Sequence, residues 1–431
     1  MSFRTTASLR LSVKPKAFAA SPFARAAYTT SSTSTSSSSV SSGQTAPVPV
    51  PVAQRPVKHF LDLHSLSPEQ ITGLITQAQQ IKSLIKPPSS APHKLQKTLT
   101  DKTVALLFSK RSTRTRIASE TSAVILGGHP MFLGPADIQL GVNESLKDTA
   151  HIIGSMADGI MARVGAHAEV ETLAKYSGIP VINALSDLYH PTQTLASLLT
   201  LARIYAKRTP TAPHFAPPTP VVASQAEASK PAAAAAAATP SGDGRATKPL
   251  QKTSWNDLWS RAGNGSKPSL LTPLQGLKVA WVGDCNNVVN DMIVTYPRLG
   301  IDLRVASPGG KNGAYGLDKR VEAKLDEFGL KHAVTFTSSP EEALKDADVV
   351  VTDTWISMGQ EEESARRLRD FAGFQITEEL CKRAGANPDW KFMHCLPRHQ
   401  DEVDDEVFYG PRSTVFEEAE NRKHTICSVF K

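Results

Sequence analysis

Short apolar runs alternate with amphipathic segments over most of this chain. In the first half, strands are predicted at Thr103–Phe108, Gly159–Val164 and Pro180–Ala184, and helices at Asp148–Met156, Glu169–Tyr176 and Pro191–Ile204. A second series predicts strands at Lys278–Gly283, Asp302–Ala306, Asp348–Thr352 and Lys391–Cys395. This alternation is typical of parallel sheets with helical crossovers. We therefore expect an α/β fold with two doubly wound parallel-sheet domains that face a cleft and are joined by interdomain helices.

The same pattern divides the chain into five predicted parts. A leader and spacer (1–58) precede a first domain (59–206), a low-complexity insertion (207–275), a second domain (276–412) and a C-terminal helix (413–431) that packs back on the first domain. Alanine and proline runs cannot bury a core, so we expect the insertion to be largely disordered. Its Trp255–Trp259 stretch could form one helical turn that docks on this protein or on a partner.

Charge separates the N-terminus from the rest of the chain. Seven Lys or Arg residues and no acid precede Asp62, which leaves 41 basic against 41 acidic residues in the remainder. A neutral body gives little support for a nucleic-acid partner. The acid-free, Arg- and Ser-rich leader is typical of a transit peptide, although it could be only a disordered tail. Arg25-Ala26-Ala27-Tyr28 resembles a matrix-protease site, which indicates the mitochondrial matrix.

Other classes of protein are disfavoured by what the sequence lacks. No run is long and apolar enough to cross a membrane. The four cysteines show no paired zinc spacing, so we expect neither a metal site nor a disulfide framework.

Ser112-Thr113-Arg114-Thr115-Arg116 stands where the first predicted strand gives way to a helix over Ile117–Leu126. Backbone N–H groups at a helix start attract anions, and guanidinium groups bind phosphate oxygens. The alternative is a capped helix with solvated arginines. We favour a site for phosphate or a phosphorylated small molecule.

Three further segments and one arginine carry candidate chemistry. His190-Pro191-Thr192-Gln193 opens a helix, where His190 and Gln193 could hold a carbonyl oxygen and an NH2 group or could be a cap and a packed histidine. Arg163 ends a strand, where it is a ligand contact or a rim ion pair. Asp353-Thr354-Trp355-Ile356-Ser357-Met358-Gly359 and His394-Cys395-Leu396-Pro397-Arg398 also follow strands. Asp353 there could meet an ammonium group, and Cys395 is either inert or a substrate contact.

Taken together, these segments resemble the aspartate/ornithine carbamoyltransferase family from about Phe60 to the C-terminus, apart from the insertion. Ser112–Arg116 and His190–Gln193 match motifs that the family shares, whereas Asp353–Gly359 and His394–Arg398 match its ornithine branch. Asp137–Gly141 and Glu418–Arg422 agree as well. The resemblance implies transfer of a carbamoyl group from carbamoyl phosphate to the δ-amine of L-ornithine, with no cofactor, in a homotrimer.

The resemblance also implies roles for individual residues. Cys395, Asp353, Arg163 and His190 would be catalytic. Carbamoyl phosphate would be bound by Ser112, Thr113, Arg114, Thr115, Arg116, Gln139 of a neighbouring subunit, Arg163, His190, Gln193, Cys395, Leu396 and Arg422. Ornithine would be bound by Asn287, Asp353, Ser357 and Met358.

Three other functions are alternatives on the sequence alone. A sister transferase could act on aspartate, putrescine or an acylated ornithine, although Asp353 would repel the carboxylate of aspartate. The second block could bind a nucleotide for an oxidoreductase, but Asp284-Cys285-Asn286-Asn287 lacks the G-x-G-x-x-G pattern. A catalytically silent regulatory relative would not need Arg114, His190, Asp353 and Cys395 intact.

Overall fold

The computed structural model describes residues 58–86, 95–136, 144–213, 269–356 and 361–431. The leader, the Trp255–Trp259 stretch, Gln139, Ser357 and Met358 lie outside these ranges. Of the helices in the described ranges, none is long and apolar enough to cross a membrane.

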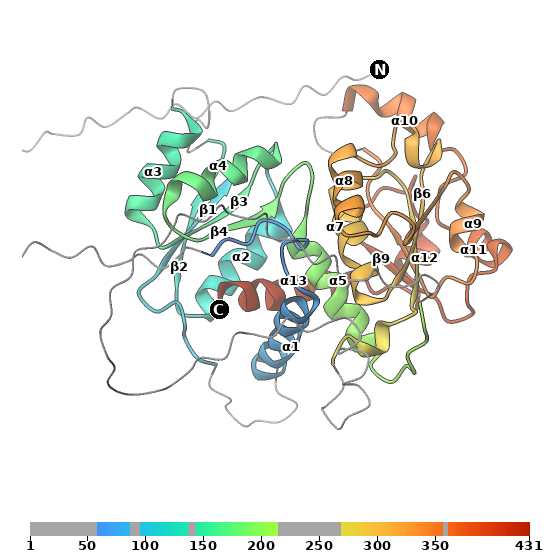
Figure 1. The fold of residues 1–431 in the computed structure, drawn as a ribbon, viewed down its shortest axis with the longest axis horizontal. Coiled ribbons are helices and arrows are strands. Elements are labelled where there is room, and N and C mark those ends of the chain that lie inside the picture. Colours follow the sequence, from blue (N-terminus) through green and yellow to red (C-terminus); the bar gives the residue numbers. More distant parts are fainter. Residues whose placement is uncertain (1–57, 87–94, 137–143, 214–268, 357–360) are drawn as a thin grey trace, which may run out of the picture. The chain divides into compact units, whose positions relative to one another are not determined.

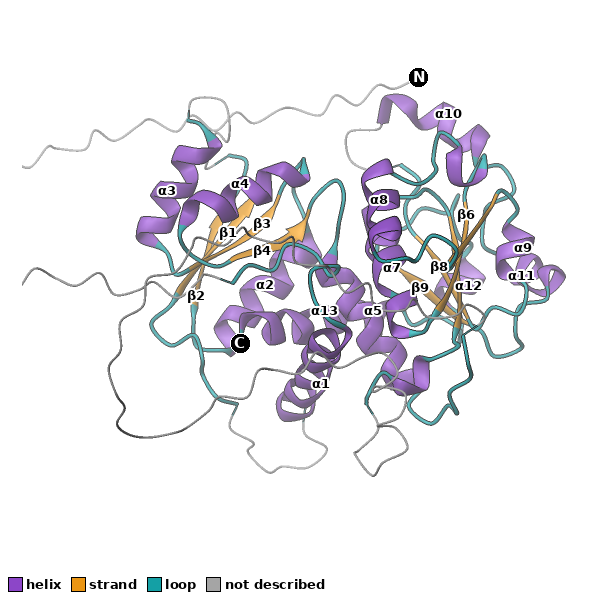
Figure 2. Cartoon of the chain, in the orientation of Figure 1, coloured by secondary structure: helices purple, strands orange, loops and turns teal. Residues whose placement is uncertain are grey.

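The first sheet has four parallel strands in the order β2-β1-β3-β4. Its strands are β1 (Thr103–Phe108), β2 (His129–Leu133), β3 (Gly159–Arg163) and β4 (Val181–Leu185). The helices associated with it are α1 (Pro68–Ile85), α2 (Thr113–Ile125), α3 (Leu146–Met156), α4 (His167–Ser177) and α5 (Pro191–Ile204). Figure 1 and Figure 2 show α3 and α4 on one face of this sheet and α2 on the other.

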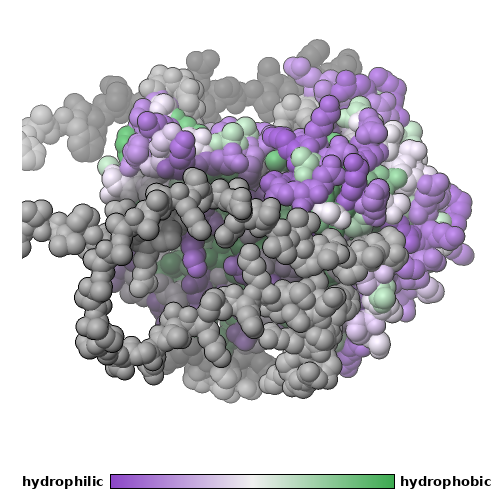
Figure 3. Space-filling model, viewed as in Figure 1, coloured by the Kyte–Doolittle hydropathy of each residue, from purple (hydrophilic) through white to green (hydrophobic). Residues whose placement is uncertain are grey.

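The second sheet has five parallel strands in the order β7-β6-β5-β8-β9. Its strands are β5 (Lys278–Val282), β6 (Asp302–Ala306), β7 (Val334–Thr337), β8 (Val349–Thr352) and β9 (Lys391–His394). The helices around it are α7 (Asn287–Thr295), α8 (Lys319–Glu327), α9 (Pro340–Leu344), α10 (Ser364–Asp370), α11 (Glu378–Ala384) and α12 (Asp405–Tyr409). On the face seen in Figure 3, hydrophilic residues predominate where α8 and α10 lie in Figure 1.

Side chains of successive strand residues enter different cores because they alternate between the two faces of a sheet. In β1, Val104 and Leu106 pack toward α1 and α5, whereas Ala105 and Leu107 pack toward α3 and α4. β5 behaves in the same way in the second sheet. Helices therefore cover both faces of each sheet, as a doubly wound fold requires, and the predicted fold class is confirmed.

The C-terminal helix α13 (Val415–Phe430) packs on α1, α2 and α5. Ser122 Oγ donates to the Lys423 carbonyl at 2.8 Å, and Asn421 Nδ2 donates to Thr200 Oγ1 at 2.8 Å. One continuous apolar cluster runs from α1 and α13 through α5 and α7 to the second sheet. The helices between the sheets are therefore part of one shared core.

The two ends of the insertion are held together in the described part of the chain. Thr211 N donates to the Gln275 carbonyl at 3.2 Å, and Arg208 Nη1 donates to the same oxygen at 2.7 Å. Leu271 and Leu274 are already buried. The described body therefore includes both ends of the 207–275 segment, and residues 208–211 lie beside Gln275.

Candidate functional site

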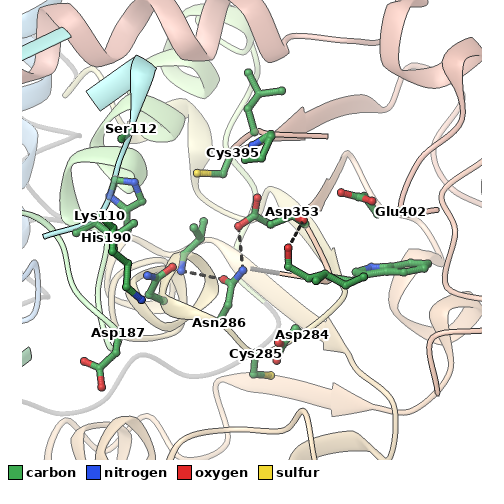
Figure 4. A pocket seen from close by; sticks show the side chains of 18 of the residues that line it. Lys110, Ser112, Asp187, His190, Asp284, Cys285, Asn286, Asp353, Cys395 and Glu402 are labelled. Carbon is green, nitrogen blue, oxygen red and sulfur yellow. Dashed lines mark hydrogen bonds between the residues drawn. The ribbon is translucent and has the colours of Figure 1, made fainter. Parts of the chain in front are cut away.

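A cavity of about 1190 Å³ is lined by residues that follow strands of both sheets. In the first sheet the chain order reverses between β1 and β3, and in the second it reverses between β5 and β8. Ligands of open α/β sheets bind outside the carboxyl ends of the strands at such reversals. The cavity is lined here by Ser112, Thr113, Arg114, Thr115, Arg163, His190, Asn286, Asn287, Asp353, Cys395, Leu396 and Arg422. Figure 4 shows Ser112 and His190 on one side and Asn286, Asp353 and Cys395 on the other.

The loop after β1 combines a helix cap with the cavity wall. Helix α2 begins at Thr113, four residues earlier than predicted, so Arg114 lies in its first turn. Ser112 is the N-cap residue, and its Oγ accepts a hydrogen bond from Thr115 N at 3.3 Å. Other N–H groups of this turn remain available to an anion. Ser112 is therefore both the cap of α2 and part of the cavity wall.

Three arginines carry positive charge into the cavity: Arg114, Arg163 and Arg422. The Nε atom of each is buried and has no hydrogen-bond partner in the described part of the chain. Burial, together with the neighbouring Arg163 and Arg114, lowers the pKa of Arg422 to about 10. Arg422 is buried, whereas Arg114 and Arg163 are half-buried, and a buried cation without an anionic partner is costly. Their grouping is typical of a site whose anion binds from solution.

His190 caps helix α5 at the edge of the cavity. Its backbone N donates to Asp291 Oδ2 at 2.6 Å, and its Nδ1 lies 3.4 Å from Thr192 Oγ1. Burial and the nearby arginines lower the pKa of His190 well below its ordinary value. The imidazole is therefore neutral near pH 7, and it can act as a hydrogen-bonding group without adding a further positive charge.

Asp353 lies on the opposite side of the cavity, directly after β8. Its Oδ2 accepts a hydrogen bond from Asn286 Nδ2 at 2.9 Å, and its Oδ1 has no hydrogen-bond partner among the described residues. Burial raises the pKa of Asp353 to about 6, although His394 and Asn286 oppose the change. A buried carboxylate with a free oxygen can receive an ammonium group.

Strand β9 ends at His394 and leads into a strained turn. The Leu396 N–H donates to His394 Nδ1 at 2.8 Å, which places the imidazole proton on Nε2, 3.8 Å from Glu402 Oε1. Leu396 has a φ of 69°, a conformation that costs a residue with a Cβ roughly 1–2 kcal/mol. Burial, followed by Asp353, raises the pKa of Cys395. Its side chain is therefore a neutral thiol at neutral pH.

Other residues expected at the site are engaged in different contacts. Asn287 lines the cavity, and its Nδ2 donates to the Ser186 carbonyl at 2.6 Å. Arg116 does not line the described cavity: its Nε donates to Glu120 Oε1 at 2.8 Å, and its guanidinium lies 3.6 Å from the Phe132 ring centroid. Gln193 is also behind the lining, where its Nε2 donates to Glu418 Oε1 at 2.8 Å.

Sequence reasoning gave no role to three residues that organise this site. Asn286 bonds Asp353, Glu418 bonds Gln193, and Arg367 of α10 donates to Asp284 Oδ2 at 2.7 Å and to the Trp355 carbonyl at 2.9 Å. Glu418 precedes Arg422 by four residues, so helical spacing could have placed both on one face. Within the described ranges, no three His, Cys, Asp or Glu side chains group as metal ligands.

The chain is similar to known proteins over both halves. Family models described as "Aspartate/ornithine carbamoyltransferase, carbamoyl-P binding domain" and "Aspartate/ornithine carbamoyltransferase, Asp/Orn binding domain" match residues 58–203 and 275–431. The mitochondrial ornithine carbamoyltransferase of Emericella nidulans is 46% identical over 90% of this chain and 91% of its own. That of Aspergillus terreus is 46% identical over 87% of this chain and 88% of its own.

Solved structures give the same result. The crystal structure of a mitochondrial ornithine carbamoyltransferase from Coccidioides immitis aligns with a TM-score of 0.66 at 39% identity, and the alignment covers 87% of this chain and 96% of that one. The family models, the relatives and the fold agree over the segments that form the cavity. The chain therefore belongs to the aspartate/ornithine carbamoyltransferase family.

Proposed function

We propose that this protein transfers the carbamoyl group of carbamoyl phosphate to the δ-amine of L-ornithine, which yields L-citrulline and phosphate. The observation that carries the proposal is the polarity of the cavity: three arginines, each with a buried Nε atom, line one part of it, and the buried carboxylate of Asp353 lines another. The first side fits a phosphorylated substrate and the second fits an amine. The family and its relatives support this pairing.

Carbamoyl phosphate is assigned to the first domain, residues 59–206. The start of α2 and Arg114 bind the phosphate, because N–H groups and a guanidinium converge there. Arg163 and neutral His190 donate to the carbonyl oxygen. The remaining contacts that we propose are Ser112, Thr113, Thr115, Gln139 of a partner subunit, Gln193, Cys395, Leu396 and Arg422, while Arg116, whose side chain bonds Glu120 outside the cavity lining, supports the loop.

Ornithine is assigned to the second domain, residues 276–412. Asp353 and the Cys395 thiol face its δ-amine, and Asn287, Ser357 and Met358 hold its α-amino and α-carboxylate groups. The Asp353 carboxylate favours a substrate that ends in an amine. Aspartate would place a carboxylate against it, so the aspartate reaction of the same family is disfavoured here.

The reaction requires a neutral amine, whereas an alkylammonium has a pKa near ~10.4. Ionised Asp353 accepts a hydrogen bond and then a proton from the ammonium. The freed nitrogen attacks the carbonyl carbon, the C–N bond forms as the bond from that carbon to the phosphate oxygen breaks, and the departing phosphate takes the second proton from the nitrogen. Arg163 and His190 stabilise the negative charge on the carbonyl oxygen, while Arg114 and Arg422 neutralise the departing phosphate.

We also infer that the protein is a homotrimer of the mitochondrial matrix. The mitochondrial location is supported by the relatives. Apolar side chains on α2 and on edge strand β2 are exposed in the single chain: Ile117 by 60%, Val124 by 58% and Met131 by 43%. Gln139 follows that edge in sequence, which suits a residue that completes a neighbouring site. An exposed apolar patch of this kind is typical of a subunit contact.

The decisive experiment measures phosphate release and the carbamoylated product from carbamoyl phosphate with ornithine, putrescine, aspartate and an acylated ornithine in parallel; the product with ornithine is citrulline. Turnover with ornithine, lost in a folded Arg114→Ala variant, is the expected result. Turnover with a different amine would keep the phosphate site and overturn the ornithine assignment. A folded protein inactive with all four would instead be the silent relative.

A further inference from the structure

Glu418 on α13 is a buried carboxylate whose hydrogen-bond donors are all uncharged. It is 2% exposed. Its Oε1 accepts hydrogen bonds from Gln193 Nε2 at 2.8 Å and from Ser197 Oγ at 2.5 Å, both on α5. Its Oε2 accepts one from His394 N at 3.3 Å, at the end of β9. One carboxylate therefore connects helix α5, which begins directly after His190, with strand β9, which ends beside Cys395.

This contact settles which end of the Gln193 side-chain amide faces inward. Burial raises the pKa of Glu418 to about 7, and its ionised form can only accept hydrogen bonds, so above that pH it holds the NH2 end of Gln193, whose Nε2 lies 2.8 Å from Glu418 Oε1. The other end, Oε1, is buried and has no hydrogen-bond partner in the described part of the chain. Gln193 Oε1 is therefore a hydrogen-bond acceptor that can receive a donor from a ligand. Its neighbour Thr192 accepts a hydrogen bond from Arg422 Nη2 at 3.2 Å, so this turn lies against the cavity wall.

We propose that Glu418 is a positioning residue that orients the Gln193 amide so that Oε1 accepts a hydrogen bond from the NH2 group of the substrate. Acyl phosphates that carry a methyl group in place of NH2 cannot make this bond and bind less tightly. The inference rests on the proposed function, since it concerns how that site recognises carbamoyl phosphate. Acetyl phosphate has the same carbonyl and phosphate, but its methyl group cannot donate a hydrogen bond. It leaves Gln193 Oε1 buried and unpaired, which corresponds to a preference of about 10- to 100-fold.

A glutamine at position 418 cannot replace the carboxylate in this role. Its side chain has one acceptor end and one donor end, whereas three donors converge on Glu418. If its NH2 faced His394 N, two donors would meet. If its NH2 faced α5, Gln193 would have to turn round and present Nε2 to the ligand. In both arrangements the contact with the carbamoyl NH2 is weakened.

The test compares the wild-type protein with Glu418→Gln in binding three probes: carbamoyl phosphate, acetyl phosphate and inorganic phosphate. We expect Glu418→Gln to weaken carbamoyl phosphate by about 10-fold or more. Inorganic phosphate should change by less than about 2-fold, because it has no group for Gln193, and the preference for carbamoyl over acetyl phosphate should narrow. At saturating carbamoyl phosphate the KM for ornithine should stay within about 2-fold of wild type.

Glu417→Gln is the matched control on the same helix. Glu417 Oε1 accepts from Arg203 Nε at 2.7 Å and is partly exposed, so this variant should leave all three affinities unchanged. An equal loss for all three probes in Glu418→Gln would show a merely structural role and overturn the proposal. So would an unchanged preference for carbamoyl over acetyl phosphate.

If Glu418→Gln does not fold, two other variants decide the matter. Glu418→Asp keeps the carboxylate but shortens the side chain by one methylene. Gln193→Leu removes the acceptor atom Oε1 itself. Both should narrow the preference for carbamoyl over acetyl phosphate, and retention of that preference in Gln193→Leu would refute the proposal. These outcomes concern binding selectivity, so they are distinct from failure of wild-type protein to form citrulline.

Discussion

Replacement of Arg422 tests whether its positive charge serves ligand binding or the stability of the fold. It is 3% exposed, and its Nη2 donates to the hydroxyl oxygens of Thr115 at 3.1 Å and Thr192 at 3.2 Å. Burial lowers its pKa from 12.5 to about 10. That difference corresponds to a cost of about 3 kcal/mol for the charged form of Arg422 in the unliganded site.

Arg422→Met removes this cost and also removes the two hydrogen bonds. A hydrogen bond to a charged group contributes about 1.5 kcal/mol at the lower end of its range, so the loss is also about 3 kcal/mol. The two effects offset each other. We therefore expect the free energy of unfolding without ligand to change by no more than about 1 kcal/mol.

Ligand stabilisation should behave differently. Phosphate at 100 times its Kd stabilises a folded protein by about 2.7 kcal/mol, and a 100-fold weaker Kd would reduce this to about 0.4 kcal/mol. Urea unfolding followed by the fluorescence of the buried Trp281 and Trp390, with and without phosphate, measures both quantities. The control is Arg298→Met, because Arg298 donates to the carbonyls of Leu63, His64 and Leu66. It should destabilise the protein and leave the phosphate effect intact.

A fall of about 3 kcal/mol or more in the free energy of unfolding of Arg422→Met without ligand would contradict this expectation. That result would make Arg422 a structural residue like Arg298. Full retention of the phosphate effect in Arg422→Met would refute it as well, because the charge would then not serve the anion.

Two further predictions concern the amine side of the cavity. The Asp353 carboxylate is lost as pH falls through its pKa of about 6, so kcat/KM for ornithine should fall there. Asn286→Ala removes a donor to the ionised form and should move this acid limb to higher pH by up to about one unit; an unmoved limb contradicts it. Arg367→Met removes the Nη1 donor that bonds both Asp284 and the Trp355 carbonyl, so the KM for ornithine should rise about 10-fold while that for carbamoyl phosphate stays constant. An equal rise in both KM values would count against this role.

Predicted and observed strands agree best where both faces of the strand are buried. β1 and β6 have the predicted bounds, and β5, β8 and β9 differ by one residue at an end. β2 and β7 were not predicted. Both are edge strands, and their side chains are largely half-buried or exposed, so their apolar pattern is weak. A central strand of a parallel sheet, by contrast, reads as a continuous apolar run.

The start of α2 shows why a local pattern can place a boundary wrongly. The apolar residues from Ile117 onward predicted a later start, whereas Ser112 caps a helix that begins at Thr113. Helix starts are set by caps more than by apolar spacing. The consequence is chemical, because Arg114 lies in the first turn of the helix and not in a loop before it.

The sequence by itself determined the alternation of strands and helices and the chemistry-bearing segments at the strand ends. These features are local, since they depend on spacing and residue type along one stretch of chain. Only the tertiary structure decided that Gln193 bonds Glu418, 225 residues away in the chain, that Asn286 bonds Asp353, and that three arginines share one cavity. Such pairings arise when α13 and the two sheets pack into a common core, and burial there sets the charge states of His190, Asp353 and Cys395. Contacts between segments far apart in sequence, and the low dielectric that they create, have no signature in the pattern of any single segment.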